Sequence, residues 1–525
     1  MTPHRFPRLV HHLLVNTAAA YPQAPAVVAA GGRLDYGDLL GRSRRLAAAL
    51  RRAGVGAGDP VVLFLENDLT CCVAIFASLM AGAVFVVINP QTRAEKLGFV
   101  IDDCAATALV TEAHLLRTAA PAASGRRTLR AVVCAGERPA IEGPTPLMLE
   151  EALALEEAPA GPELDRLDAG VPLDLAALVY TSGTTGTPKG VMISHQAMLF
   201  TIGSLCDYLR LDASDRILSV LPLAFTYGLY QLLTATAVGA TLVLERSFTY
   251  PARVLERLAA TEATTLPGVP SIFARLVAMH RKEPLRFPSV RRVTNAAAAL
   301  PEAHLPVLGD IFPNAALYPM YGQTECARAC FLDPALVALK PGSVGKAIPG
   351  TELVILSPEG AKVAAGEVGI LHVRGPHVMV GYWQRPEETA RTLVPGRLPG
   401  ERMLCTHDWF RVDEEGDHYF VGRSDDIIKT RGEKVSPAEV ESVLCGIDGV
   451  VEAAVIGVPD EIMGEAVRAH VVLEEGATLG VKDLEAACRQ RLEIFMVPRD
   501  ILIETELPKT PNGKVSKREL RARVG

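Results

Sequence analysis

The chain has 525 residues, of which 49% are hydrophobic and 22% are charged, and its formal net charge is -7. A chain of this length exceeds what one hydrophobic core organises, so we expect two or more domains. A mildly acidic chain lacks the broad basic face of nucleic-acid-binding proteins, so we expect no nucleic-acid partner.

The ten cysteines are scattered along the chain. Cys326 and Cys330 come nearest to metal-ligand spacing, but no further His or Cys completes a zinc site. Reduced thiols are the default in a cytosolic protein. The residues after Met1 lack the basic and apolar regions of a signal peptide. We therefore expect a cytoplasmic protein.

One uncharged stretch, Leu69–Ile88, is long enough to cross a bilayer. Ala81 and Gly82 divide it into a half rich in small residues and a β-branched half, Val84–Ile88. This change of texture favours a buried helix followed by a buried parallel strand over a membrane span. We therefore expect no integral membrane segment.

The N-terminal part alternates helical and strand-like segments. Arg42–Ala53 is typical of an amphipathic helix and Val61–Leu65 of a short buried strand. Alternation of this kind predicts an α/β domain with a largely parallel sheet. The interval 136–170, rich in Pro, Gly, Glu and Ala, is interpreted as a solvated connection.

The alternation continues as far as Asn295, and the pattern changes after Gly342. Short strands with Gly and Pro turns then predict an antiparallel region, and a compact βα pattern follows from about Arg423. The predicted fold class is α/β. It has a large N-terminal domain of two mixed or parallel sheets with flanking helices and an antiparallel β-barrel-like part, and a small mobile α+β C-terminal domain.

Tyr180–Gly190 predicts a buried strand, a loop rich in glycine and hydroxyl groups, and a second strand. Glycines bring backbone N–H groups close to an anion, and hydroxyls and a lysine add donors and positive charge. The loop is therefore suited to a phosphate chain. It is not the P-loop of ordinary nucleotide hydrolases, because Pro188 precedes Lys189 and the following residues are strand-like.

A second motif, Tyr321–Glu325, reads Tyr-Gly-Gln-Thr-Glu. Its ring can stack on adenine, its threonine hydroxyl can reach a phosphate, and its carboxylate can hold Mg²⁺, which prefers hard oxygen ligands. A third, Gly366–Pro386, has glycines at hairpin turns and apolar strand residues, so most of it is interpreted as structural.

Two further motifs lie toward the C-terminus. Asp408, interpreted as a strand-end aspartate, is suited to accept hydrogen bonds from both ribose hydroxyls, and the guanidinium of Arg423 to hold ribose or phosphate oxygens. In Pro508–Lys514, Asn512 and Gly513 predict a tight turn that presents Lys514 at its tip.

Together, these five motifs in this order resemble the adenylate-forming superfamily of acyl- and aryl-CoA synthetases, peptide-synthetase adenylation domains and beetle luciferases. The chain is most similar to the acyl-CoA ligases. The resemblance implies that a carboxylic acid reacts with ATP and Mg²⁺ to give an acyl-adenylate and pyrophosphate, and that a thiol, CoA or the phosphopantetheine of a carrier protein, then takes the acyl group.

The resemblance also implies a role for individual residues. Domain boundaries at 1–422, 423–427 and 428–525 follow, with the hinge at Asp425 and CoA contacts at Arg431 and Gly432. Lys514, Thr184 and Glu325 would be catalytic, with Glu325 also the metal ligand. The nucleotide would be bound by Thr181, Ser182, Gly183, Thr185, Gly186, Thr187, Lys189, Tyr321, Gly322, Thr324, Asp408, Arg423 and Lys429. In the family pattern a glycine precedes the aspartate, and here His407 takes its place.

The acid is expected to be an apolar aliphatic or aromatic carboxylate. Relatives that activate α-amino acids place an aspartate after the phenylalanine equivalent to Phe225, and here Thr226 follows it. Phe225 also stands where many relatives have a histidine. Ala296 and Ala297 lie where relatives have a glycine-containing stretch, and Met320 lies where glycine is common. These four residues are the predicted acyl pocket.

Three alternatives to an acid–CoA ligase remain open from the sequence. The acceptor could be the arm of an acyl or peptidyl carrier protein. A luciferase-like oxygenase shares the fold but oxidises its adenylate, and no residue points to that reaction. A non-catalytic relative is disfavoured because Glu325, Asp408, Arg423 and Lys514 are all present.

Overall fold

The computed structural model describes residues 6–154, 170–182, 188–423, 426–430, 433–460, 464–510 and 513–524, with only the backbone at Ser182, Glu433, Lys434 and Gly464. The chain divides into two compact units that interleave along the sequence. The first comprises Met1–Thr265, Thr324–Ala327 and Gly375–Arg402, and the second comprises Leu266–Gln323, Arg328–Arg374 and Met403–Gly525.

The first unit contains a mixed sheet in the order β19-β9-β8-β4-β3-β5-β6-β7. The pairs from β8 to β7 are parallel, while β9 pairs antiparallel with both β8 and β19. The strands are β3 (Pro60–Phe64), β4 (Val84–Ile88), β5 (Ala108–Glu112), β6 (Ala131–Ala135), β7 (Thr145–Met148), β8 (Leu175–Ser182), β9 (Pro188–Ser194) and β19 (Gly381–Tyr382).

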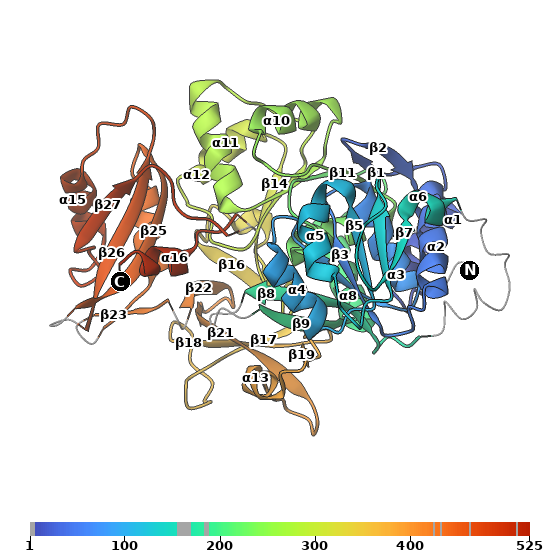
Figure 1. Ribbon diagram of the computed structural model, residues 1–525. Helices are drawn as coiled ribbons and strands as arrows, with labels where there is room; N and C mark the ends of the chain where they lie inside the picture. Colours follow the sequence, from blue (N-terminus) through green and yellow to red (C-terminus); the bar gives the residue numbers. More distant parts are fainter. Residues whose placement is uncertain are drawn as a thin grey trace. The chain divides into compact units, whose positions relative to one another are not determined.

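Two helices, α4 (Ala94–Asp103) and α5 (Leu116–Ala123), pack on this sheet (Figure 1). Their apolar positions, such as Leu97 and Ala119, join strand residues such as Val62 in one buried core. Tyr180 and Trp383 pack at its edge. The core therefore supports the strand that enters the phosphate loop.

The first unit also contains the strand series β10-β11-β1-β2, in which only the β1–β2 pair is antiparallel. The strands are β1 (Pro25–Ala29), β2 (Gly32–Asp35), β10 (Arg216–Ser219) and β11 (Thr241–Leu244), and β20 spans Leu393–Pro395. The remaining helices are α1 (His11–Ala20), α2 (Tyr36–Arg52), α3 (Leu69–Met80), η1 (Ala113–Leu115), α6 (Leu149–Leu153), α8 (His195–Leu209), α9 (Thr226–Val238), α10 (Pro251–Ala260) and α13 (Pro386–Thr392).

Polar side chains at the helix starts explain several of these boundaries. The carboxylates of Asp35 and Asp68 accept from backbone N–H groups at the starts of α2 and α3, and the hydroxyl of Ser194 does so for α8. Each side chain replaces a missing intrahelical acceptor.

The structure separates Leu69–Ile88 into helix α3 and strand β4, as the sequence predicts. In the part of the chain that is described, no helix is both long and apolar enough to span a bilayer. The interpretation of 136–170 as a connection is wrong over 145–153, which forms β7 and α6. β7 extends the parallel sheet beyond β6, and Leu149 and Ala152 are buried.

The second unit begins its sheet with two parallel strands, β13 and β14, and continues in the antiparallel order β15-β16-β22-β21-β18-β17. This confirms the predicted antiparallel region. The strands are β13 (Arg292–Asn295), β14 (Ala316–Tyr321), β15 (Cys330–Phe331), β16 (Ser343–Ala347), β17 (Glu352–Leu356), β18 (Val368–Arg374), β21 (Arg402–Val412) and β22 (His418–Arg423). β12 (Thr265–Gly268), α11 (Pro270–Lys282), α12 (His304–Ile311) and η2 (Pro334–Leu336) complete this part.

The C-terminal residues of the second unit form a sheet in the order β24-β23-β26-β25, with β27 parallel to β26 (Figure 1). The elements are β23 (Ile428–Thr430), β24 (Glu433–Val435), α14 (Pro437–Cys445), β25 (Val450–Asp460), β26 (Gly464–Leu473), α15 (Val481–Arg491), β27 (Asp500–Glu504) and α16 (Lys517–Ala522). α14 and α15 share one core with the strands, and Leu520 of α16 belongs to another. The predicted α+β composition is confirmed, whereas the domain boundary at 422/423 stays a prediction.

Candidate active site

The predicted phosphate loop is framed by a β-hairpin. Strands β8 and β9 pair up to its ends, with Thr181 opposite Lys189 and Ser182 opposite Pro188. The predicted strand–loop–strand order is confirmed. Gly183, Thr184, Thr185, Gly186 and Thr187 lie outside the described residues.

Lys189 is held at the exit of this loop. Its ammonium lies 5.5 Å from the ring centroid of Tyr382 and 4.0 Å from a carboxylate oxygen of Glu388. The side chain is 18% exposed. Attraction to the ring face and to the carboxylate stabilises the cation near the loop.

Glu325 is held in the first unit by one hydrogen bond to its carboxylate and one to its backbone. The hydroxyl of Tyr382 donates to Oε1 at 2.8 Å, and the backbone N–H of Met379 donates to the Glu325 carbonyl at 2.8 Å. A hard anionic oxygen held in this way fits Mg²⁺, which is usually bound by one or two carboxylates together with phosphates. Among the described residues, no three His, Cys, Asp or Glu side chains cluster as a metal site of their own.

Asp408 is the centre of a polar cluster in the second unit. Its side chain is 6% exposed, and Oδ2 accepts from the Tyr321 hydroxyl at 2.6 Å and from Gln323 Nε2 at 2.9 Å. Nε of Arg423 lies 3.4 Å from Oδ1. Gln323 also donates to the carbonyl of Thr406 at 2.7 Å. The structure therefore brings Tyr321, Asp408 and Arg423 together, as predicted.

The prediction that Asp408 ends a strand is wrong. β21 continues to Val412, and Asp408 pairs with Arg423 of β22 inside the ladder. The backbone is irregular just before Asp408, since His407 has a φ of 56°, in the left-handed region that favours glycine, but the strand continues past it. His407 thus adopts a backbone region that favours glycine, the residue that the family pattern has at this position.

Burial raises the pKa of the Asp408 carboxyl, because the charged form loses solvation. The charge of Arg423, the donors Tyr321 and Gln323, and the charge of Lys514 all oppose this rise. Lys514 is therefore close enough to Asp408 to stabilise its carboxylate. Within the second unit, the predicted adenylation lysine and the predicted ribose ligand share one electrostatic environment.

Backbone hydrogen bonds join Thr510 to Gly513 and Lys514 across the predicted turn, of which Asn512 lies outside the described residues. The N–H of Thr510 donates to the Lys514 carbonyl at 2.7 Å, and the N–H of Gly513 donates to the Thr510 carbonyl at 2.9 Å. Gly513 has a φ of 78°, which glycine adopts without steric cost. The hydroxyl of Ser271, in α11, donates to the Gly513 carbonyl at 3.1 Å. This contact holds the lysine turn against α11.

The predicted acyl-pocket residues are distributed over both units. In the first, Phe225 is half-buried at the start of α9, with its ring edge-on to that of Tyr227 at 6.3 Å. In the second, Ala296 and Met320 are 3% and 4% exposed and directly follow the paired residues Asn295 and Pro319 of β13 and β14. Ala297 has a φ of 78°, which agrees with glycine being usual in this stretch of relatives.

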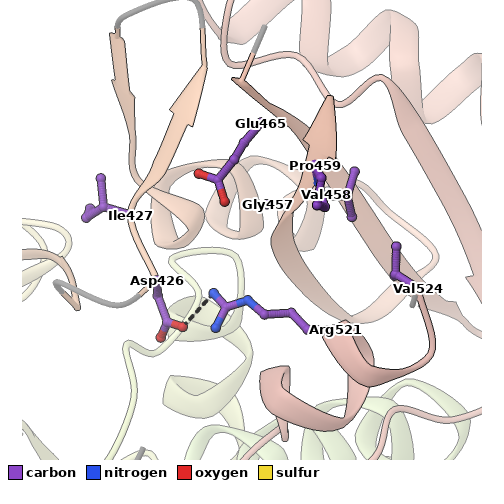
Figure 2. Close-up of a pocket in the computed structure, with 8 residues that line it drawn as sticks. All are labelled: Asp426, Ile427, Gly457, Val458, Pro459, Glu465, Arg521 and Val524. Carbon is purple, nitrogen blue, oxygen red and sulfur yellow. Dashed lines mark hydrogen bonds and ion pairs between the residues drawn. The ribbon is translucent and has the colours of Figure 1, made fainter. Parts of the chain in front are cut away.

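The predicted hinge and CoA contacts, Asp425, Arg431 and Gly432, lie outside the described residues. Lys429 is exposed on β23, and its N–H donates to the Glu465 carboxylate at 2.7 Å. Asp426 accepts from Arg521 of α16 at 2.8 Å, beside a cavity of about 450 Å³ (Figure 2).

The cysteines offer no activated nucleophile. All ten are free thiols, and burial raises the pKa of several of them, including Cys71 and Cys405. A raised pKa leaves the thiol protonated, and the protonated form is the unreactive one.

Sequence reasoning missed three contributors to the site. Gln323 bonds Asp408 directly, and its place within the Tyr-Gly-Gln-Thr-Glu motif was the available signal. Tyr382 belongs to a motif interpreted as structural. Asp103, which bonds Tyr180 and Arg385, carried no signal, because its partners are 77 and 282 residues away.

Comparison with known proteins agrees with this geometry. Residues 14–383 match the family model described as AMP-binding enzyme, and residues 439–514 match its C-terminal domain. A feruloyl-CoA synthase from Amycolatopsis sp is 34% identical over 513 residues, covering 97% of this chain and 98% of that protein. A long-chain-fatty-acid–CoA ligase from Bacillus subtilis (strain 168) is 30% identical over 552 residues, covering 99% of this chain and 95% of that protein.

A solved structure supports the same assignment. A benzoate CoA ligase from Burkholderia xenovorans LB400 superposes with a TM-score of 0.85 at 27% identity, covering 98% of this chain and 99% of that one. Both matched family domains and the near-complete coverage of relatives confirm the resemblance read from the motifs. The chain belongs to the AMP-binding enzyme family and is an AMP-forming acid–CoA ligase that uses ATP, Mg²⁺ and CoA.

Proposed function

We propose that this chain converts an apolar aliphatic or aromatic carboxylic acid into its CoA thioester, with the site residues in the roles predicted above. The observation that carries the proposal is the cluster around Asp408, where the residues suited to ribose lie within electrostatic reach of Lys514. A nucleotide bound there would present its α-phosphate to the lysine.

In the first half-reaction the substrate carboxylate attacks the α-phosphorus of ATP, and pyrophosphate leaves. Negative charge grows on the phosphoryl oxygens, and a preorganised cation stabilises that transition state. Lys514 supplies this charge, and the hydroxyl-rich loop with Lys189 holds the departing phosphates. Glu325 would hold Mg²⁺, which neutralises phosphate charge when bound. No protein nucleophile takes part.

In the second half-reaction the thiol of CoA attacks the carbonyl of the adenylate and AMP leaves. We assign Asp425 to the hinge about which the C-terminal domain turns between the two half-reactions, and Arg431 and Gly432 to CoA contacts, as in relatives. Hinge motion of this kind replaces one set of catalytic groups by another.

The lining of the predicted acyl pocket supports an uncharged substrate body. Phe225, Ala296, Ala297 and Met320 are all apolar, and no acidic residue occurs from Leu221 to Gly239 to hold an ammonium group. The relatives include ligases named for feruloyl and long-chain fatty acyl groups, so both aromatic and aliphatic acids belong in a substrate panel.

CoA is the proposed acceptor, and a carrier-protein arm is the alternative. Incubation with ATP, the activated acid and either CoA or holo-carrier protein separates them by the thioester formed. We place the reaction in the cytoplasm, where the ten free thiols stay reduced.

The Lys514→Ala variant tests the mechanism. Its adenylation rate, measured as pyrophosphate release across a panel of carboxylic acids, should fall by about 100-fold or more, because the charge facing the α-phosphate is lost. Thioester formation from a supplied acyl-adenylate and CoA should stay within about threefold of wild type.

Lys509→Ala is the matched control, since this lysine lies in the same turn region but pairs with Glu452 at 3.2 Å. It should leave both half-reactions unchanged. Equal loss of both half-reactions in a folded Lys514→Ala protein would show that the lysine does not act in adenylation. Absence of pyrophosphate release by the wild type with every acid would overturn the proposed activity.

A further inference from the structure

The segment Gly381–Arg385 contacts two parts of the predicted site in the first unit. One is the strand that leaves the predicted phosphate loop, and the other is the predicted metal ligand Glu325. β19 pairs antiparallel with β9, Gly381 opposite Met192 and Tyr382 opposite Val191. The N–H of Trp383 then donates to the Gly190 carbonyl at 2.8 Å. The segment is thus bonded along the strand that leaves the phosphate loop.

The backbone of this segment adopts two unusual conformations. Gly381 has a φ of 153°, and a Cβ there would lie 2.7 Å from Thr389. Gln384 has a φ of 52°, in the left-handed region that side chains other than glycine rarely adopt. Such backbone conformations cost free energy and persist only where many surrounding contacts hold the residue in place. Here they turn Tyr382 and Arg385 toward different partners.

The first partner is Glu325, the carboxylate suited to the metal. The Tyr382 hydroxyl donates to its Oε1 at 2.8 Å, and the side chain of Lys189 lies over the ring of the same tyrosine. A neutral donor on one oxygen limits rotation of the carboxylate without neutralising its charge.

The second partner is Asp103, the last residue of α4. A carboxylate at a helix C-terminus is disfavoured by the helix dipole, and this one is 8% exposed. It is compensated by Arg385, 2.8 Å from Oδ1, and by the Tyr180 hydroxyl, 2.6 Å from Oδ2. Trp383 Nε1 donates to the Asp103 carbonyl at 3.1 Å.

Tyr180 belongs to β8, the strand that enters the phosphate loop, so the chain Arg385–Asp103–Tyr180 ties one root of the loop to the segment. Gly190, at the other root, leaves room for this packing: a Cβ there would lie 3.2 Å from the Tyr180 ring and 3.3 Å from Trp383. Both carboxylate oxygens of Asp103 are hydrogen-bonded, so we assign the ion pair with Arg385 to fixing the position of Tyr180 rather than to stability.

We propose that Tyr382 and Arg385 are positioning residues: Tyr382 aims the Glu325 carboxylate at the metal, and Arg385, through Asp103 and Tyr180, sets the root of the phosphate loop. The inference rests on the proposed function, since it assigns support for that site. It predicts two different binding defects.

Calorimetric titration with ATP in EDTA and with ATP in excess MgCl₂, without acid or CoA, measures both defects directly. In Tyr382→Phe, the gain in ATP affinity due to Mg²⁺ should shrink by about tenfold, since one hydrogen bond to a charged group is lost. Affinity for metal-free ATP should stay at the wild-type value. Tyr419→Phe, which removes a phenol bonded to Asp413 at 3.2 Å, is the matched control and should change neither.

Arg385→Gln should lower the ATP affinity by a similar factor, about tenfold, in EDTA and in MgCl₂. The ratio of the two affinities, which is the gain due to Mg²⁺, should stay at the wild-type value. Arg385→Lys keeps a positive charge beside Asp103 and should recover part of the ATP affinity. This variant still tests the inference if Arg385→Gln fails to fold. A wild-type Mg²⁺ gain in Tyr382→Phe, or wild-type affinity in both Arg385 variants, overturns the inference. Failure of the wild type to bind ATP at all overturns the proposed function instead.

Discussion

Asp408, the proposed ribose ligand, shows how neighbouring residues oppose the effect of burial on a single carboxyl. Burial raises the pKa of this carboxyl and so disfavours its ionised form, yet a ribose ligand accepts two hydroxyl hydrogens and is best ionised. Arg423, Tyr321, Gln323 and Lys514 all lower its pKa against the effect of burial. The neighbours therefore favour the ionised form, which the proposed ribose contact requires.

Replacing Arg423 tests this balance through pH. Removing the guanidinium should raise the pKa of Asp408 further, so the protonated form appears at higher pH. The acid limb of kcat/KM for ATP, measured by pyrophosphate release, should therefore move to higher pH in Arg423→Gln. At neutral pH the same variant should lose about 10- to 100-fold in kcat/KM, the effect of one hydrogen bond to a charged group.

Arg423→Lys is the control for charge, because it keeps a cation near Asp408 but loses the planar fork. Its acid limb should stay near that of the wild type even where its kcat/KM falls. An unshifted limb in Arg423→Gln would mean that Asp408 does not titrate in ATP binding.

The proximity of site residues was predictable where they sit inside a motif. Tyr321, Asp408 and Arg423 were found from the sequence because type and order within a short stretch carried the signal. Asp103 was not, because a helix-terminal aspartate is ordinary until its partners are known. Tyr382 was named but given only a packing role, since the sequence does not show what its hydroxyl reaches.

At the scale of elements, β16 depends on one glycine. Gly345 has a φ of 75°, and a Cβ there would lie 2.0 Å from the carbonyl oxygen of Phe331 and 2.4 Å from Leu332 Cα. Both are backbone atoms and cannot rotate away. β16 shifts its register against β22 at this residue, so the close approach is part of how the antiparallel strands join.

Gly345→Ala should therefore destabilise the second unit by about 3 kcal/mol or more, adding backbone strain to overpacking. Gly342→Ala is matched, since Gly342 has a φ of 74° but no atom within 4 Å of the added Cβ. It should cost only about 1–2 kcal/mol. Thermal unfolding followed by the fluorescence of Trp409, in a Trp383→Phe background, reports the second unit. Equal shifts for both variants would refute the steric argument.

Element types followed from the texture of the sequence, as for α3 and β4. The failures have physical causes. Residues 145–153 were interpreted as a connection because the interval is rich in Pro, Gly, Glu and Ala, and a four-residue strand is too short to show a clear periodic pattern. Asp408 was predicted at a strand end, whereas pairing with β22 carries the strand on to Val412, a long-range contact that the local sequence does not show.

At the scale of the whole molecule, sequence order and compact units do not coincide. The motif Tyr321–Glu325 begins in the second unit and ends in the first. The length of the chain predicted more than one domain but not this interleaving of segments. Pairing between strands far apart in the sequence decides which segments share a core, and the local sequence does not show it. The α+β C-terminal sheet was predictable, since its elements are contiguous in the chain.

The connection before that sheet is short: β22 ends at Arg423 and β23 begins at Ile428. The N–H groups of Asp426 and Ile427 both donate to the Arg423 carbonyl, at 2.9 and 3.0 Å. Few backbone torsions are thus available to change the orientation of the C-terminal sheet, and the predicted hinge, Asp425, lies among them.

Asp425→Pro should separate the two half-reactions. Proline fixes φ near −65° and removes the N–H, so a rotation that needs a change of φ at this residue is blocked. Pyrophosphate release in the first turnover should stay within about threefold of wild type, while thioester formation should fall by about 100-fold. Asp425→Ala removes the carboxylate but leaves the backbone free, and it should form thioester at nearly the wild-type rate. If both variants lost thioester formation alike, the carboxylate rather than backbone rotation would be responsible; if Asp425→Pro kept full turnover, the hinge would lie elsewhere.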